Sequence, residues 1–170
     1  MLAKQARDMA SYNRWMNERL YAVCAQLSDD ERKRDCGAFF KSIHATLNHL
    51  LLADKIWLGR FLGEPFAATR LDTELHSDFT ALTEDRAAED RRIVAWADSL
   101  TEDILAGELH YTGVVHRGIR KYEMWLVVAH FFNHQTHHRG QITTLLSQFG
   151  KDVGVTDLIM LPEVVERHAT

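Results

Sequence analysis

Proline is nearly absent from this chain, with only Pro65 and Pro162 among its 170 residues. Proline removes a backbone hydrogen-bond donor and breaks helices, so its rarity leaves long stretches free to be helical. Apolar residues recur at helical spacing through most of these stretches. The sequence therefore predicts an all-α protein, and one domain over residues 1–170 suits a chain of this length.

Four long segments show the helical pattern. They cover residues 2–27, 38–62, 72–106 and 121–149. Gly63 and Pro65 end the second segment, and Gly150 ends the fourth. The strongly charged stretch 83–92 is expected at the surface. Four helices with modest connections predict a four-helix bundle, with a short helical piece added by the tail.

The segment between the third and fourth helices has a different pattern. Gly107, Gly113 and Gly118 interrupt a run of β-forming residues, namely Leu109, Tyr111, Val114, Val115 and Ile119. This pattern predicts a short hairpin or an irregular β segment.

The composition bears on location and partners. A net charge of −4 and a pI near 6.2 give no reason to expect a nucleic-acid partner. Cys24 and Cys36 form no CxxC pattern and are expected to be free thiols in a reducing compartment. The N-terminus lacks a signal-peptide pattern, and no apolar run approaches the ~18 residues of a membrane span. We therefore expect a cytoplasmic protein that binds neither nucleic acid nor membrane.

Four histidines crowd the stretch HFFNHQTHHRGQ, residues 130–141. A helix turns about 100° per residue, which directs His134 and His138 along the most consistently apolar stripe of this helix. Two imidazoles at positions i and i+4 can reach one metal ion. His130 and His137 lie off the stripe and are weaker candidates.

A third ligand is sought on the second helix. His49 shares its direction with Ala53 and Ile56 and is expected to point inward, whereas His44 points toward a side expected to be exposed, marked by Asn48, Lys55 and Gly59. Three protein ligands leave a coordination position for water or substrate, as in catalytic zinc sites. The alternatives are a hydrogen-bonded core position for His49 and a histidine network without metal.

Neighbouring polar residues allow two roles each. Gln141 points near the ligand stripe and suits a hydrogen bond to a ligand or substrate, or a capping or packing role. Asp54 suits pairing with a buried cation or a helix-surface salt bridge. Arg139 is expected on the outer side of its helix, as an ion-pair partner rather than a substrate contact.

Trp125 and Phe132 are expected on the less buried side of the fourth helix. Apolar residues there predict a contact surface, which suits either a homodimer or packing against the hairpin or the tail.

Three segments together resemble the DinB-like family, the DinB/YfiT-type metalloenzymes. The segment HFFNHQTHHRGQITTLL, residues 130–146, is similar to the family's signature in its fourth helix. SYNRWMNERL near the start and HATLNHLLLADKIWLGRF in the second helix agree with it, and DLIMLPE matches the family's ending. The similarity covers essentially the whole chain.

The resemblance implies an up-down-down-up four-helix bundle and a divalent metal, usually nickel or zinc. In the family the first ligand follows an asparagine, which matches His49 after Asn48, and the other two match His134 and His138. Homodimers are common, and some relatives are transferases that use low-molecular-weight thiols such as bacillithiol or mycothiol.

The sequence thus predicts a divalent-metal-binding protein, either a thiol-dependent transferase or a hydrolase acting on a small molecule. The alternative is a non-catalytic metal-binding module for stress or interaction. No catalytic residue is assigned, and the absence of glutamate from HQTHH does not support a protease of the HExxH type.

Overall fold

The computed structural model describes residues 2–68, 70–113 and 118–169. Most of these residues are helical, and a small two-stranded sheet is added. In chain order the elements are α1 (Leu2–Cys24), α2 (Asp29–Lys33), α3 (Ile43–Leu62), α4 (Phe79–Ser99), α5 (Glu102–Leu105), β1 (Glu108–Thr112), β2 (Ile119–Glu123), α6 (Met124–Gln148), the 3₁₀ turn η1 (Leu158–Met160) and α7 (Pro162–His168).

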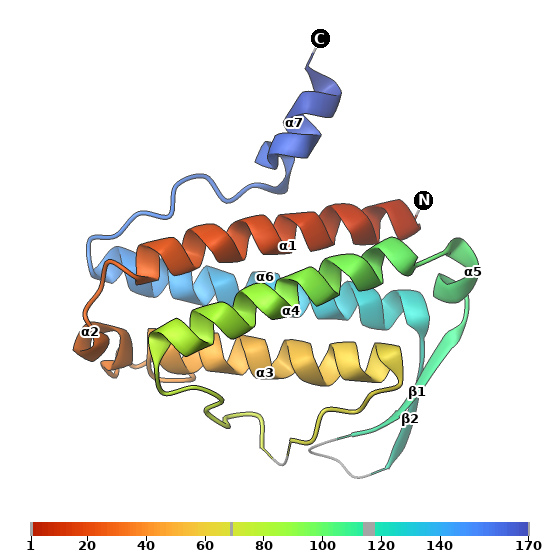
Figure 1. Ribbon diagram of the computed structural model, residues 1–170, viewed down its shortest axis with the longest axis horizontal. Helices are drawn as coiled ribbons and strands as arrows, with labels where there is room; N and C mark the ends of the chain where they lie inside the picture. Colours follow the sequence, from red (N-terminus) through yellow and green to blue (C-terminus); the bar gives the residue numbers. More distant parts are fainter. Residues whose placement is uncertain (1, 69, 114–117, 170) are drawn as a thin grey trace.

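The four long helices lie side by side, with α1 and α6 running in one direction and α3 and α4 in the other (Figure 1). Helix α1 packs against α4 and α6, and α3 packs against the same two helices. Two apolar clusters fill the space between them. One centres on Leu20, Leu47 and Leu146, and the other on Trp96 and Phe131. The helices therefore enclose a core along their whole length.

Local capping sets helix boundaries that differ from those predicted. Helix α3 begins at Ile43 rather than at residue 38, because the Ser42 side chain accepts the backbone N–H of Ala45. The predicted helix 72–106 was wrong at both ends. It begins after Asp78, which caps Ala81, and stops at Ser99, with a separate short helix α5 beyond.

The first and last long helices are also shorter than predicted. Helix α1 ends at Cys24 rather than at residue 27. Helix α6 begins at Met124 rather than at residue 121, because residues 121–123 pair with β1. The antiparallel register from Glu108↔Glu123 to Thr112↔Ile119 confirms the predicted hairpin. Val114 and Val115, which the prediction included, lie outside the described residues.

The charged stretch 83–92 is only partly at the surface: Glu84, Arg91 and Arg92 are exposed as expected, but three other charged residues are buried. These are Arg86, Glu89 and Asp90. The Arg86 guanidinium lies 2.6 Å from Asp54 and 2.9 Å from Asp90, and we call these three residues the ionic network. Asp54 thus pairs with a buried cation, as one of the two alternatives predicted. Charge pairing across the helices allows burial that a lone charge would not tolerate.

Two expectations about helix α6 were wrong. Phe132 is buried at 4% exposure, and Arg139 is buried at 3%. Arg139 donates to the Asn13 side chain and lies over the Tyr12 ring, so it interacts with α1 instead of solvent. The apolar stripe predicted for this helix underestimated its buried face, because α1, α3, α5 and the hairpin all contact α6.

The expected exposed side of α3 is covered as well. His44, Asn48 and Gly59 are buried. The segment between α3 and α4 runs across this face, and the Asn48 side chain accepts the N–H groups of Leu75 and His76. A loop that supplies its own backbone groups to a polar side chain can bury that side chain at little cost.

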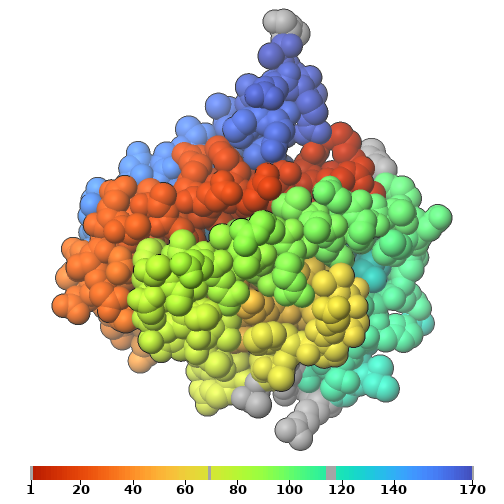
Figure 2. Space-filling model, in the orientation of Figure 1, coloured from red at the N-terminus to blue at the C-terminus, as the bar shows by residue number. Residues whose placement is uncertain are grey.

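The C-terminal segment leaves the body of the molecule. Helix α7 stands off beyond α1, as the ribbon and the space-filling view both show (Figures 1 and 2). The Tyr12 hydroxyl donates to the Thr156 carbonyl, and Arg167 pairs with Asp8 at 3.0 Å. The expected short helical piece in the tail is confirmed. Across the described residues, no helix has the length and apolar character needed to span a membrane.

Candidate metal centre

Three histidines from two helices meet at one point. His49 comes from α3, and His134 and His138 lie one turn apart on α6. The Nε2 atom of His134 lies 3.3 Å from that of His49 and 3.1 Å from that of His138. In the described part of the chain, these side chains form the one group of three or more whose ligand atoms are close enough to hold a metal ion. We call them the histidine triad.

The outer hydrogen bonds of the triad determine where the protons lie. His49 Nδ1 is 2.8 Å from the Leu71 carbonyl oxygen, which can only accept a hydrogen bond. His138 Nδ1 is 2.8 Å from the Gln141 side-chain oxygen. Each Nδ1 therefore carries the proton, and the Nε2 atoms of His49 and His138 present lone pairs toward His134.

The charge state of the triad follows from its burial. Burial, with a smaller contribution from the neighbouring imidazoles, lowers the pKa of His134 to about 3 and that of His138 to about 4. Burial also lowers the pKa of His49. At neutral pH all three rings are therefore neutral, which is the state in which histidine binds a metal ion.

The ring of His49 is held from two sides. Phe40 stacks on it with ring centroids 3.9 Å apart. On the other side, Asn48 binds the 64–78 segment that brings the Leu71 carbonyl to His49 Nδ1. Asn48, the residue directly before His49, thus has a structural role, because it fixes the loop that orients the His49 ring.

The remaining histidines and Gln141 have separate roles. Gln141 bonds His138 and so orients that ring, the first of the two roles predicted for it. His137 is exposed and bonds Gln141 through its Nε2 atom. His130 lies with its ring centroid 6.0 Å from that of His134, outside the triad. His44 Nε2 bonds the His76 carbonyl, away from the triad.

A cavity of about 470 Å³ opens beside the triad, between α3, α6 and the hairpin. We call it the hairpin-side cavity. It is lined by His49, Ala53, Ile56, Trp57, Arg60, Leu71, Tyr111, Gly113, Arg120, Tyr122, His130 and His134. Its volume lies within the range of ~300–1,000 Å³ that is usual for small-molecule sites. The triad therefore faces a space large enough for a substrate.

Sequence reasoning missed the far wall of this cavity. Arg60 was not singled out, although it lies eleven residues after His49 and so returns to nearly the same face of the helix, about 20° away. Helical direction could have found it. Tyr111 and Arg120 had no such signal, because the hairpin brings them to α3 only in the folded chain.

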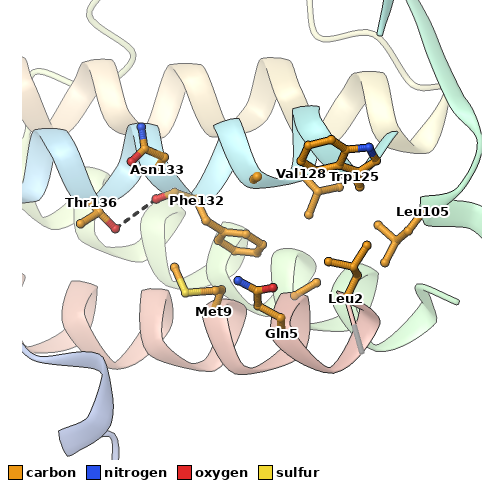
Figure 3. A pocket seen from close by; sticks show the side chains of 11 residues that line it. Leu2, Gln5, Met9, Leu105, Trp125, Val128, Phe132, Asn133 and Thr136 are labelled. Carbon is orange, nitrogen blue, oxygen red and sulfur yellow. Dashed lines mark hydrogen bonds between the residues drawn. The ribbon is translucent and has the colours of Figure 1, made fainter. Parts of the chain in front are cut away.

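A second cavity, of about 330 Å³, lies between α1 and α6 (Figure 3). Val128 and Phe132 from α6 and Met9 from α1 point into it, and Trp125 and Leu2 stand at one end. The walls are mostly apolar, and none of the residues that line it is ionisable. It has no part in the histidine triad.

Comparisons with known proteins show the family of the chain. The chain matches the family model described as the DinB family over residues 1–168. It is 26% identical over 158 residues to Protein DinB of Bacillus subtilis (strain 168), a match that covers 89% of this chain and 90% of that protein. Because the family model spans nearly the whole sequence, the chain belongs to the DinB family.

Proposed function

We propose that His49, His134 and His138 bind one divalent metal ion, zinc or nickel, and that the protein is a metal-dependent enzyme acting on a small molecule. The observation that carries the proposal is the convergence of three Nε2 atoms, with the rings of His49 and His138 keeping their protons on the outer side. The lone pairs of His49 and His138 point at a third imidazole nitrogen, and a cation bound among the three nitrogens would be coordinated by all of them.

The spacing of the ring nitrogens supports this assignment. Two nitrogens that each lie about 2.0–2.1 Å from one tetrahedral zinc ion are about 3.3 Å apart. The Nε2 separations of 3.3 and 3.1 Å in the triad agree with that value. Three histidine ligands with no carboxylate or thiolate also suit zinc or nickel better than magnesium or calcium.

A bound divalent ion would act as a Lewis acid and lower the pKa of a coordinated water or thiol. The residues of the chain do the positioning. Leu71 and Gln141 hold the rings of His49 and His138, and Phe40 covers one face of His49. The wall of the hairpin-side cavity holds the reacting molecule close to the triad.

His130 is a candidate for moving a proton. It lines the hairpin-side cavity one helical turn from His134. Burial and the nearby Arg60 charge lower its pKa, so the ring is neutral at pH 7 and can accept a proton from a group bound in the cavity.

The reaction we propose is thiol transfer or hydrolysis. In the first, a low-molecular-weight thiol would be presented to an electrophile; in the second, water would attack an ester or amide. The cavity beside the triad favours an enzyme over a non-catalytic metal-binding module, because a module has no need of a space for a small molecule.

Metal analysis of protein purified without a histidine tag tests the metal site. We expect about one equivalent of metal per chain, and less than about half an equivalent would refute the proposal. Turnover is then measured with thiols paired with electrophiles, and with esters. His138→Ala should abolish turnover, whereas the exposed His137→Ala should retain it. Turnover that His138→Ala leaves unchanged would refute metal-dependent catalysis.

The four long helices support the family's up-down-down-up four-helix bundle as the architecture. Their directions, with α1 and α6 opposed to α3 and α4, are those of that topology (Figure 1). The hairpin and helices α2, α5 and α7 are additions around it.

A homodimer is the oligomeric state we propose, with a second copy covering the cavity between α1 and α6 (Figure 3). Trp125 of α6 is 41% exposed and Leu2 of α1 is 40% exposed, and both line this cavity. Large apolar side chains gathered on one face are typical of a contact between chains. Trp125→Glu should shift sedimentation from dimer to monomer. A wild-type protein that sediments as a monomer at all concentrations would refute the dimer.

A further inference from the structure

The lining of the hairpin-side cavity is positively charged. Two of its lining residues, Arg60 and Arg120, are positively charged, and none is acidic. The chain as a whole carries a net charge of −4. A cationic cavity in an acidic protein focuses anions toward it.

Arg60 has no carboxylate partner. Its guanidinium lies 4.5 Å from the Trp57 ring centre and 4.1 Å from that of Tyr111, and it forms no ion pair with any residue that the structure describes. Burial lowers its pKa, since the charge loses water without gaining an anion. The two aromatic rings contact the guanidinium and leave donors on its edge free for a ligand.

Two other arginines near the histidine triad are paired with carboxylates of the chain itself. Arg86 pairs with Asp54 and Asp90 inside the ionic network. Arg70 pairs with Asp72 at 2.6 Å, and both line a separate cavity on the Phe39 side of the triad. Arg120, which lies on the hairpin, resembles Arg60 in having no ion pair among the described residues. Among the arginines that line the two cavities beside the triad, the unpaired ones are thus on the hairpin side.

The position of Arg60 relative to the triad sets the shape of an occupant. His49 and Arg60 lie on nearly one face of α3 and are separated by about 16 Å along the helix axis, at about 1.5 Å per residue. Ala53 and Ile56 line the path between them. Because helical side chains lean toward the N-terminus, the guanidinium reaches back toward the triad. The occupant is therefore elongated, with an apolar middle.

We propose that the hairpin-side cavity binds an elongated organic anion, with its carboxylate or phosphate against Arg60 and Arg120 and its other end at the histidine triad. The inference rests on the proposed function, because the triad supplies the reacting end. It adds the substrate class: a small molecule whose anionic group lies several bonds from the reacting atom. The paired N–H donors of an arginine guanidinium can bind two oxygens of either a carboxylate or a phosphate.

Thiol probes on the Co²⁺-loaded protein test this arrangement, because a thiolate bound to cobalt gives a near-ultraviolet absorption band. We expect 8-mercaptooctanoate to bind at least about tenfold more tightly than 8-mercaptooctan-1-ol. Octanoate and octyl phosphate, which lack the thiol, should compete with it, and the tighter of the two identifies the preferred anionic group. Equal binding of the acid and the alcohol would overturn the proposal.

Two arginine variants form a matched pair. Arg60→Gln should reduce the preference for the acid to less than about threefold, because the charge-assisted hydrogen bond is lost. Arg70→Gln, whose arginine is paired and lies on the other side of the triad, should keep the full preference. If Arg60→Gln does not fold, the exposed Arg120→Gln should still lower the preference. A preference unchanged in both Arg60→Gln and Arg120→Gln would overturn the assignment.

Failure of the metal site can be distinguished from failure of the anion site. Cobalt content is measured first, in the wild type and in each variant. If the wild type takes up no cobalt, the proposed function fails, while calorimetry of octanoate against octan-1-ol on the metal-free protein still tests the arginines. Normal cobalt uptake without any preference for the anion would overturn this inference alone.

Discussion

Two groups of polar side chains are buried between the long helices, and they are satisfied in opposite ways. In the ionic network, the Arg86 guanidinium meets the carboxylates of Asp54 and Asp90 at 2.6 and 2.9 Å. In the histidine triad, Nε2 atoms meet one another at 3.1 and 3.3 Å. The network contains its own countercharges, whereas the triad directs neutral lone pairs at a point where the protein supplies no cation.

This difference separates a structural polar cluster from a binding one. Burial alone does not distinguish them, since His49 and His138 are almost as buried as Asp54 and Arg86. What distinguishes them is whether the polar atoms are paired within the cluster, as in the ionic network, or direct lone pairs toward a common point, as in the triad. The network should therefore determine whether the protein folds, and the triad should determine what it binds.

The largest expected effect is the loss of the cation from the network. Arg86→Leu leaves Asp54 and Asp90 buried without the cation that pairs with them, and should lower the free energy of unfolding by about 3–5 kcal/mol in urea denaturation. Arg70→Leu breaks an exposed pair and should cost less than about 1 kcal/mol. A loss below about 1 kcal/mol for Arg86→Leu would show that the network contributes little to folding.

Removing a member of the triad should strongly weaken metal binding and change the stability of the fold little. His134→Ala should weaken zinc binding by more than about 100-fold, because loss of a ligand exceeds the 10–100-fold effect of losing an outer hydrogen bond. The metal-free variant should stay as stable as the wild type to within about 1 kcal/mol, since crowding of lone pairs is relieved. Competition with a chromophoric chelator measures the affinity. His137→Ala is the control, and equal affinities of the two variants would contradict the ligand assignment.

A smaller effect on zinc affinity is expected for a residue that hydrogen-bonds one of the triad histidines. Gln141→Leu removes the acceptor of His138 Nδ1, so the ring loses its orientation, and zinc affinity should fall by about 10–100-fold. The Thr144 hydroxyl on the same helix bonds only the Gly140 carbonyl, so Thr144→Ala should leave zinc affinity unchanged. A drop of the same size in both variants would point to a general disturbance of α6.

The smallest effect is the response of the metal-free protein to pH. The pKa of His134 is about 3 and that of His138 about 4, both below the value of about 6.5 expected in the unfolded chain. The unfolded state therefore binds more protons below pH 6.5, and stability is lost as the pH falls through that value. Between pH 7 and 5 the loss due to His134 should be about 1–2 kcal/mol, after allowance for solvent screening.

Urea midpoints at several pH values, compared with those of His134→Gln, isolate this contribution. The wild type should lose stability more steeply than the variant between pH 7 and 5. Parallel curves would show that His134 takes up a proton equally well in the folded and unfolded states.

The helical class, the hairpin and the inward pair His134 and His138 could be predicted from local patterns. Helical direction depends only on the spacing of residues along one helix, so it identified these positions and His49 without knowledge of the neighbours. The same reasoning was wrong for Arg139, for His44 and for the buried residues of the stretch 83–92. A polar residue can be buried when a partner from another helix satisfies it, and that partner is invisible within one segment.

By itself, then, the sequence determined that long helices form and which of their histidines share a direction, because both depend on local backbone geometry. The tertiary structure decided the rest. The segment crossing α3 brings the Leu71 carbonyl to His49, the pairing of Arg86 with Asp54 turns charged residues inward, and the hairpin places Tyr111 beside Arg60. These contacts join residues far apart in the chain, so they exist only after the helices pack and the loops cover them.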